Sequence, residues 1–408
     1  MSSNKIYLGV KSLSKHIQLK TISSGIVAAI FGCTGPALII IGGAEAGGLS
    51  DVQTISWLFA VYFFGGLLGI FLALKYRQPI AGAYTIAGAV LVAGSLTQFS
   101  INEAVGAYLV SSIIVLILGI TGLIEKVMHR IPVPIIMGMI VGVMIRFATE
   151  LITAVKISPL IAGSAIAVYL LSIRFIKGFP PVLSALVVSV LLAVLTKQFH
   201  FHDIKSVLIF PQIVIPSFSF KSIISISIPL SILVICTENA QAIGVLMAQK
   251  YRPPINPMTI WSGIGSIFAS FFGGHAINIA GSMTAICASE DSGTKEGRYA
   301  AVFVNGTLFS TFGIFASIIV PFIIAMPGVI VSSIAGLAMI GVLASSLKLA
   351  FSDSKFQMGA LFALIIGMSG VNFFNISSPF WAIIGSLIIS IIIESDHFKI
   401  KQSEELNE

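Results

Sequence analysis

The chain has 408 residues, of which 56% are hydrophobic and only 10% are charged, against about 25% charged residues in an average globular protein. The mean hydropathy of +1.03 indicates apolar runs too numerous for a water-soluble core, so most of the chain is expected to lie in lipid. This excludes soluble enzymes and nucleic-acid-binding proteins. The net charge of +7 comes from basic residues that stand between apolar runs, so they indicate membrane topology rather than a polyanionic partner.

Apolar stretches long enough for helices of about 20 residues alternate with short polar joints, which predicts fourteen membrane segments. The third and tenth segments are the shortest and the most interrupted by polar or small residues. The first has no small-residue cleavage motif, so we expect it to remain in the mature protein. The predicted segments are 21–46, 54–74, 80–97, 103–124, 132–154, 157–176, 180–197, 223–248, 255–272, 276–289, 297–323, 327–349, 356–373 and 376–394.

The orientation follows from the basic residues, because loops rich in Lys and Arg stay in the cytoplasm. With the N-terminus inside, 18 Lys and Arg residues fall on the cytoplasmic side and 4 on the outer side, while Arg146 lies within a segment. These account for all 23 basic residues. We therefore predict that both termini are cytoplasmic.

An internal repeat relates the two halves of the chain. Residues 83–88 and 276–281 share the pattern A-x-[TN]-I-A-G at an offset of 193 residues. At an offset of 203, residues 33–37 resemble residues 236–240. Seven segments per half is an odd number, so the halves are predicted to be inverted in the membrane. Two further matches keep the first register, Glu103 with Glu296 and Pro134 with Pro327.

Neither the cysteines nor the histidines of the inter-repeat stretch form a metal-binding pattern. Cys33, Cys236 and Cys287 all lie in apolar segments without CxxC or Cys/His spacing, so we interpret them as small buried hydrophobic residues. His200 and His202 stand in the polar stretch 198–222, which we interpret as a solvated loop.

An ionisable group inside the hydrocarbon region is a functional candidate by default, because its burial is costly. Glu238 lies near the middle of the eighth segment, between Thr237 and Asn239 and close to Gln241. We predict that Glu238, Asn239 and Gln241 bind the substrate. A carboxyl at that depth is suited to exchanging a proton, as a proton-coupled carrier requires. The structural alternative is a protonated carboxyl held by Thr237 or Asn239.

The two A-x-[TN]-I-A-G hexads predict a short extended piece followed by a half-helix, because each stands in a segment too short and too broken for one full helix. The half-helix starts, near Gly88 and near Gly281, would offer free backbone N–H groups to an anionic or polar ligand. The alternative is that the small residues only allow close helix packing. The predicted lining residues are Tyr84, Thr85, His275, Asn278 and Ser282.

Arg146 and Glu150 stand four residues apart in the fifth segment, so they share a helix face and can form an ion pair. Arg146 is also suited to bidentate recognition of a substrate carboxylate, which would make it part of a gate. The sequence leaves both interpretations open.

These features together resemble the benzoate/proton symporter (BenE-type) family, which is similar in fold to the uracil/proton symporters. The resemblance covers nearly the whole chain. The motifs that carry it are Ser56-Trp57, Arg77-Gln78-Pro79, Ile131-Pro132 ahead of Ile145-Arg146-Phe147, Asn239-Ala240, Thr284-Ala285-Ile286-Cys287, Ala335-Gly336-Leu337-Ala338 and Ser378-Pro379-Phe380-Trp381.

The resemblance implies a core domain and a gate domain, with short antiparallel strands in segments 3 and 10. The core is expected to combine 21–131 with 223–325, and the gate 132–197 with 327–394. The remaining parts are a cytoplasmic N-terminal segment 1–20, a linker 198–222 and a cytoplasmic tail 395–408. The first repeat is then 21–197 and the second 223–394.

The chain departs from the family at two places. The third segment more often reads Trp-Ser-Thr-Pro-Gly in the family, where residues 84–88 read Tyr-Thr-Ile-Ala-Gly. The eighth segment more often has a neutral residue where this chain has Glu238, which resembles the uracil-type carriers, in which a glutamate contacts the substrate.

We therefore expect an all-α polytopic membrane protein with fourteen segments as a 7+7 inverted repeat, in the inner or plasma membrane. The expected function is proton symport of benzoate or a similar small aromatic carboxylate. A nucleobase carrier, favoured by Glu238 and Asn278, and a channel-like anion conductor are the alternatives. The sequence contains no P-loop, metal cluster or nucleophile–base spacing, so neither an enzyme nor a cofactor beyond the coupling proton is expected. A homodimer is left open.

Overall fold

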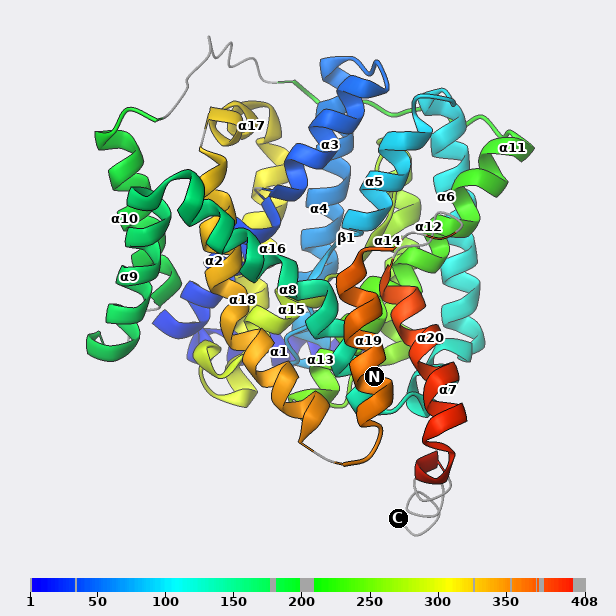
Figure 1. Cartoon of the computed structure of the whole chain (residues 1–408). Coiled ribbons are helices and arrows are strands. Elements are labelled where there is room, and N and C mark those ends of the chain that lie inside the picture. The colour runs from blue at the N-terminus through cyan, green and yellow to red at the C-terminus, as the bar shows by residue number, and fades with distance from the viewer. Residues whose placement is uncertain are drawn as a thin grey trace.

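The computed structural model describes residues 2–33, 35–176, 181–198, 209–325, 327–352, 354–371, 373 and 378–398. The described part of the first half, shown in blue to green in Figure 1, contains one strand among its helices. The elements are α1 (Ser2–His16), α2 (Leu19–Cys33), α3 (Gly35–Ala46), α4 (Asp51–Tyr76), β1 (Gly82–Tyr84), α5 (Ile86–Ser95), α6 (Ile101–Thr121), α7 (Leu123–Arg130), α8 (Val133–Ile157), α9 (Pro159–Phe175) and α10 (Pro181–Leu195).

The second half also has a strand early in its course, but its first long helical stretch is irregular. Two π-helical turns, η1 and η2, interrupt it between α11 and α13. The elements are α11 (Phe220–Ser222), η1 (Ile223–Ser227), α12 (Ile228–Leu233), η2 (Val234–Asn239), α13 (Ala240–Ala248), α14 (Ile255–Ser270), β2 (Ile277–Ile279), α15 (Gly281–Ala288), η3 (Glu290–Ser292), η4 (Lys295–Gly297), α16 (Tyr299–Ile314), α17 (Ala316–Ala325), α18 (Gly328–Phe351), α19 (Gln357–Ser369) and α20 (Ser378–Ile393).

Each of the fourteen predicted intervals contains at least one helix, but many of these helices are short or broken. Within the described residues, three helices are long and apolar enough by themselves to cross a membrane, namely α4, α6 and α8. In the third and tenth intervals a strand takes part of the length, so the helix that follows is short. The count of fourteen crossings and the inverted repeat therefore stay predictions.

The long helices begin and end at residues whose local chemistry explains the boundary. Ser50 caps α4 and Ser100 caps α6, each in a reciprocal capping box with the residue three positions later. Gly122 adopts a left-handed conformation after α6, with φ at 70°, which ends that helix. Pro132 precedes α8, where it fixes the chain entering the helix without removing a needed N–H group.

The two strands pair with each other in antiparallel register at the centre of the molecule. Gly82 lies opposite Ile279, Ala83 opposite Asn278 and Tyr84 opposite Ile277. The extended pieces predicted for the third and tenth segments are therefore confirmed. Because antiparallel strands run in opposite directions, α5 and α15 leave the pair on opposite sides, as Figure 1 shows.

The strand pair packs closely against α4 because glycines face each other at this contact. A Cβ atom on Gly65 would lie 2.8 Å from Cα of Ala83, and a Cβ on Gly69 would lie 2.7 Å from the backbone nitrogen of Gly82. Real side chains do not approach backbone atoms this closely. Glycine is therefore required at these positions for α4 to hold β1 at its observed distance.

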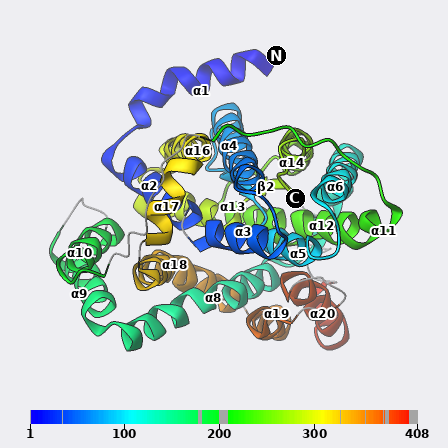
Figure 2. The same ribbon diagram turned by 90° about the horizontal axis from the view of Figure 1, so that it is seen from above.

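The helices gather in two packed groups when the molecule is viewed from above (Figure 2). One group consists of α8, α9, α10, α18, α19 and α20, in which α8 packs on both α18 and α19. The other contains the strand pair and the helices around it, with α4 packed on α16 and α6 on α14. The division of the chain into a gate and a core, and the movement of one against the other, stay predictions.

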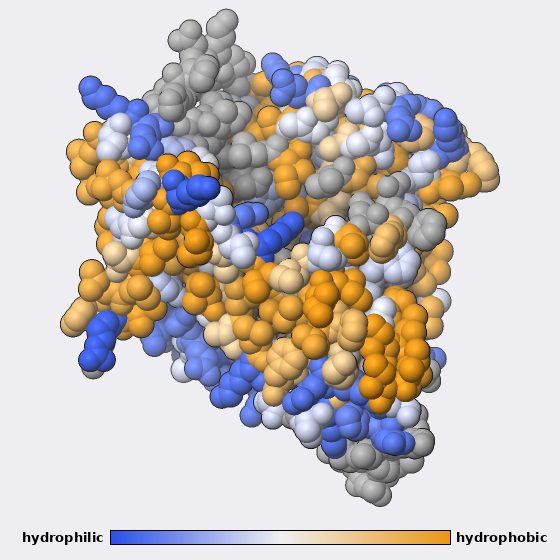
Figure 3. Space-filling model, in the orientation of Figure 1, coloured by the Kyte–Doolittle hydropathy of each residue, from blue (hydrophilic) through white to orange (hydrophobic). Residues whose placement is uncertain are grey.

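Large apolar side chains cover much of the outer surface, as expected for a protein that faces lipid. Figure 3 shows them across the middle of one face, with hydrophilic residues mostly toward its upper and lower edges. On α9 and α10 the exposed fraction reaches 73% for Phe175 and 68% for Leu195. Such exposure in water would favour aggregation, whereas in a bilayer these side chains contact lipid tails.

The described part of the predicted linker, residues 209–219, runs in an extended conformation along the ends of three helices. The N–H group of Gln212 donates to Oγ of Ser56 on α4 (2.8 Å), and that of Val214 donates to the carbonyl of Phe271 after α14 (2.8 Å). The N–H group of Ser217 donates to the carbonyl of Asn102 on α6 (2.9 Å). His200, His202 and Asp203 lie outside the described residues.

Candidate functional site

The N-terminal ends of α5 and α15 meet at the strand pair. Thr85 caps α5, with its Oγ1 accepting a hydrogen bond from the N–H group of Gly88 (3.1 Å). Ala280 precedes α15 and offers no side-chain cap. The second half-helix starts at Gly281 as predicted, whereas the first starts at Ile86, two residues before Gly88, because the Thr85 hydroxyl already satisfies the Gly88 N–H group.

Glu238 lies near these two helix ends. Its carboxyl interacts with the backbone of Gly281 and of Ile86, the first residues of α15 and α5. This is the arrangement that the positive ends of two helix dipoles favour for a negatively charged group.

A π-helical turn positions Glu238. The residue lies in η2, between α12 and α13, and such wider turns occur frequently at functional sites. At an offset of 203, Asn239 of η2 corresponds to Pro36, which stands one residue after the start of α3.

The accessible side chains around the two helix ends are few. Glu238, Ser282, Ile86 and Ala87 are only partly buried, whereas residues just before the helix starts, such as Asn278, are fully enclosed. Within the part of the chain that the structure describes, Ser282 Oγ makes no hydrogen bond. The surface that a solute could reach thus lies at the first turns of α5 and α15.

Arg146 acts on this site from the other packed group. Its positive charge interacts with the Glu238 carboxyl, although the two residues belong to different groups of helices. The guanidinium lies over the ring of Phe147, 4.9 Å from the ring centroid. Phe147 in turn makes an edge contact with Phe31 of α2, with the ring centroids 5.3 Å apart.

The predicted ion pair between Arg146 and Glu150 is not formed. Both side chains are exposed on α8, and no salt bridge joins them among the described residues. The four-residue spacing places them on one face as predicted, but the guanidinium stacks on Phe147 instead. This leaves the charge of Arg146 available to the centre of the molecule.

His275 is fully buried and both of its ring nitrogens have partners. Trp57 Nε1 lies 2.9 Å from His275 Nδ1, and His275 Nε2 lies 2.9 Å from the carbonyl oxygen of Thr85. An indole nitrogen can only donate, so Nδ1 accepts and Nε2 carries the proton that it donates to Thr85. His275 therefore holds the end of β1 and does not present a free nitrogen to a ligand.

Asn278 and Asn239 also bind backbone groups of the strand pair. The Asn278 amide nitrogen donates to the carbonyl of Tyr84 (3.3 Å), and its oxygen accepts from the N–H group of Thr85 (3.2 Å). Asn239 Oδ1 accepts from the N–H group of Ile279 (2.8 Å). Both side chains are fully buried, so they hold the short strands where no long ladder exists to do so.

Tyr84 and Gln241 are buried beside the same elements. Tyr62 donates its hydroxyl hydrogen to the carbonyl of Gly32 (2.9 Å), so the Tyr84 hydroxyl donates to Tyr62 Oη (2.9 Å). The Gln241 side chain lies directly against Gly281, where a Cβ atom would collide with it. Gly281 therefore lets α13 approach the start of α15.

Sequence reasoning missed several residues that hold this site, among them Trp57, Tyr62, Ser266 and Thr284. The N–H group of Ile277 donates to Ser266 Oγ (2.7 Å), and that of Ala81 donates to Thr284 Oγ1 (3.2 Å). The available signal was a polar group within an apolar segment, which needs a partner. The sequence does not say which partner, because the contacts join segments about 200 residues apart.

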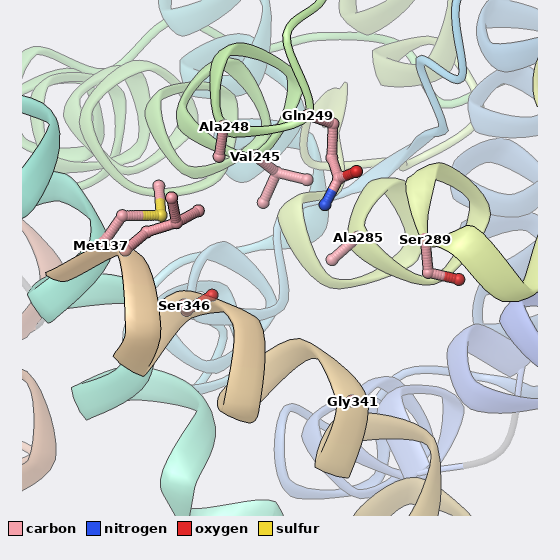
Figure 4. Close-up of a pocket in the computed structure, with 9 residues that line it drawn as sticks. Met137, Val245, Ala248, Gln249, Ala285, Ser289, Gly341 and Ser346 are labelled. Atoms are coloured by element: carbon pink, nitrogen blue, oxygen red, sulfur yellow. The ribbon is translucent and has the colours of Figure 1, made fainter. Parts of the chain in front are cut away.

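An open pocket lies between the two packed groups, on the side of the predicted cytoplasmic loops. Figure 4 shows Met137 facing Val245 and Gln249 across it. The Arg298 guanidinium donates a hydrogen bond to the Gln249 side-chain oxygen (3.2 Å). The lining residues are Met137, Val245, Ala248, Gln249, Ala285, Ser289, Gly341, Ser346 and Leu349.

No group of three or more metal-ligating side chains occurs among the described residues.

The two helix groups, the crossed half-helices and the lipid-facing surface define a membrane transporter. Residues 15–392 match the family described as "BenE: Benzoate membrane transport protein", and the chain belongs to this family. It is 29% identical over 387 residues to the benzoate membrane transport protein of Acinetobacter baylyi, covering 94% of this chain and 98% of the relative. It is 27% identical to the inner membrane protein YdcO of Escherichia coli, covering 91% and 95%. The family and the Acinetobacter relative are membrane transport proteins, so the chain belongs among transporters and not enzymes.

Solved structures of anion transporters share the fold at 14% sequence identity. The transmembrane domain of the cyanobacterial bicarbonate transporter BicA aligns with a TM-score of 0.51 over 92% of this chain and 97% of that chain. SLC26A9 aligns with a TM-score of 0.55 over 91% of this chain and 65% of that chain. At this identity the likeness concerns the fold alone. The expected likeness to the uracil/proton symporters stays a prediction.

Proposed function

We propose that this protein takes up benzoate, or a similar small aromatic carboxylate, together with a proton. The observation that carries the proposal is the meeting of two half-helix starts at the strand pair, near Glu238, in a chain of the benzoate membrane transport family. Each part of the solute then has a counterpart near the strand pair.

The carboxylate of the solute is matched by positive groups. The N–H groups of Ile86 and Gly281 lie at the positive ends of helix dipoles, and Ser282 adds a partly exposed hydroxyl. Arg146 contributes a full positive charge from the opposite group of helices. Such a set favours an anion over a neutral solute, which supports a carboxylate as the transported class.

The aromatic ring of the solute is matched by Phe31 and Phe147, whose edge contact joins the two packed groups. Aromatic rings prefer edge-to-face or offset packing with one another, and Arg146 already lies over one of these rings. A benzoate ring placed here would keep its carboxylate near Arg146. Relative movement of the two groups would then carry the solute from one side to the open pocket on the other.

The coupling proton is assigned to Glu238. The carboxyl lies deep among transmembrane elements, on a residue that is only partly buried. A carboxyl in such a place changes its charge at modest cost when the surrounding charge changes. We assign His275 no part in proton transfer, because both ring nitrogens are engaged.

The proposal is tested by uptake of radiolabelled benzoate into proteoliposomes with an acidic exterior. We expect accumulation above equilibrium that a protonophore abolishes. Benzoate uptake that does not depend on the pH gradient would instead support the channel-like conductor. Uptake of uracil without benzoate uptake would support the nucleobase carrier, for which Glu238 remains an argument although the Asn278 amide is already bound to backbone.

A further inference from the structure

The N-terminal helix α1 lies across the direction of the long helices. Figure 2 shows α1 along its length at the rim of the molecule, whereas α6, α14 and α16 are seen end-on. Residues 1–20, which include this helix, carry four lysines and no acidic residue. A basic helix that lies in the plane of a membrane surface has this direction and this charge.

One face of α1 is fixed to the protein by Tyr299, the fully buried first residue of α16. The Tyr299 hydroxyl lies 2.8 Å from Ser12 Oγ and 3.2 Å from His16 Nδ1. It also lies 3.2 Å from the carbonyl oxygen of Gly9. A Cβ atom on Gly9 would collide with the carbonyl oxygen of Leu74, so glycine at this position lets α1 lie directly on α4.

The opposite face of α1 exposes apolar and cationic side chains together. The exposed fraction is 62% for Tyr7 and 52% for Val10, and Lys11 and Lys15 are exposed as well. At about 100° per residue, Tyr7 and Val10 lie on one side of this face and the two lysines on the other. Leu8, exposed by 46%, borders the lysines. Such a division is typical of a helix at a membrane interface.

A cluster of one lysine and aromatic rings shows where α1 lies along the membrane-crossing direction. Lys75 Nζ, near the end of α4, lies 5.5 Å from the ring centroids of both Tyr76 and Trp261. Tyr and Trp gather at the headgroup level of a bilayer, where lysine side chains extend toward the polar region. Gly9 of α1 packs on Leu74, the neighbour of Lys75. This contact places α1 at the level of the headgroups.

We propose that α1 binds the anionic phospholipid headgroups of the adjacent leaflet. The ammonium groups of Lys11 and Lys15 pair with the headgroups, while Tyr7 and Val10 enter the boundary with the acyl chains. The predicted topology makes this the cytoplasmic leaflet, whose surface is negatively charged. Because Tyr299 joins α1 to α16, the lipid contact holds the group of helices around the strand pair at the membrane surface.

The two lysines keep their charge available for lipid. No acidic residue occurs in α1, and within the described part of the chain no salt bridge joins Lys11 or Lys15 to a carboxylate. Two cations four residues apart then stand on one exposed face. Phosphatidylcholine carries a phosphate but no net charge, so we expect α1 to prefer a headgroup with a net negative charge, such as phosphatidylglycerol.

The test is thermal unfolding of the purified full-length protein in detergent, titrated with dioleoylphosphatidylglycerol or dioleoylphosphatidylcholine. A ligand that binds the folded state raises the melting temperature by mass action. We expect a larger rise with the anionic lipid. The concentration that gives half of this rise should increase about fivefold in Lys11→Gln and again in Lys11→Gln with Lys15→Gln, as for the loss of one basic residue at an anionic surface each time.

Two control variants separate the role of α1 from the effect of net charge. Lys156→Gln with Lys197→Gln removes two exposed lysines from the side predicted to face outward and should respond as the wild type does. Lys11→Arg with Lys15→Arg keeps both charges and should also respond like the wild type. Equal responses of the wild type and the α1 glutamine variant, an equal loss in the Lys156 and Lys197 control, or equal stabilisation by both lipids overturns the inference.

A spin label tests the apolar side of the same face. Val10→Cys, in a chain without the native cysteines, is labelled with a nitroxide and placed in vesicles that contain phosphatidylglycerol. We expect contact with oxygen dissolved in the bilayer and protection from a water-soluble nickel complex. Contact with the nickel complex would place α1 in water, and protection from both reagents would mean that protein covers it; either result overturns the inference. Substrate takes no part in these experiments, so their outcomes are independent of the proposed function.

Discussion

Polar side chains near the strand pair fall into two classes at the scale of single residues. Asn278, His275 and Asn239 are fully buried and bind backbone groups of the strands. Glu238 and Ser282 keep accessible surface at the helix ends. The two classes predict different consequences of substitution, because the first class stabilises the fold and the second is available to a ligand.

Replacing Asn278 tests the first class against the second. Asn278→Leu leaves the Tyr84 carbonyl and the Thr85 N–H group without this partner, so we expect a loss of about 2–4 kcal/mol in the free energy of unfolding. Ser282→Ala should change stability by less than about 0.5 kcal/mol but weaken benzoate binding. Thermal unfolding and benzoate titration of both variants check this. Normal stability of Asn278→Leu with lost binding would make Asn278 a ligand contact instead.

Replacing Arg146 tests whether its charge serves the site. Arg146→Gln removes the positive charge that acts on Glu238 from α8, so we expect benzoate affinity to fall about tenfold, or roughly 1.4 kcal/mol. Arg174→Gln, at the exposed end of α9, is the control and should bind as the wild type does. Equal affinity of the wild type and Arg146→Gln would remove Arg146 from the substrate path.

At the scale of elements, the repeated hexads allowed the strands and half-helices to be predicted, because alternation of β-branched and small residues in a short span leaves few other structures. The π-helical turn at Glu238 was not predictable, since nothing in residues 234–239 marks an extra residue per turn. Nor did the spacing of Arg146 and Glu150 show that a neighbouring ring, Phe147, would take the guanidinium. Local sequence patterns determine the helices and strands. Contacts between segments distant in the sequence determine which partner each side chain binds.

The glycine contact between α4 and β1 gives a prediction at this scale. Gly69→Ala places a methyl group 2.7 Å from the backbone nitrogen of Gly82, so β1 has to shift. We expect destabilisation by about 1–3 kcal/mol and weaker substrate binding, as for overpacking of a core. Gly94→Ala in α5 meets nothing within 4 Å and should stabilise that helix by about 0.5–1 kcal/mol. Equal melting temperatures for the two variants would contradict the close packing.

At the scale of the whole molecule, the distribution of basic residues predicts both termini in the cytoplasm. Single cysteines at Ser2 and at Ser403, the latter outside the described residues, are placed in a chain without Cys33, Cys236 and Cys287. Neither should react with a membrane-impermeant thiol reagent in intact cells, and both should react after the membrane is opened. A reagent applied outside that labels either end would contradict the fourteen-segment topology.

The two helix groups give the whole molecule its proposed working principle. The strand pair, both half-helix ends and Glu238 lie in one group, while Arg146 and Phe147 lie in the other. A solute bound between the two groups contacts both of them. Its binding and its charge therefore shift the equilibrium between different relative arrangements of the two groups. Coupling to protons then requires only that Glu238 be neutral when the anion is bound.

Transport by Glu238→Gln in proteoliposomes tests this central claim most directly, by comparing benzoate counterflow with uptake driven by a pH gradient. The glutamine has the shape of a protonated glutamate but cannot release a proton. We predict that counterflow continues, because the substrate still binds and crosses, while gradient-driven accumulation disappears. Full accumulation of benzoate by the Glu238→Gln variant would contradict the account, since the proton would then be carried elsewhere.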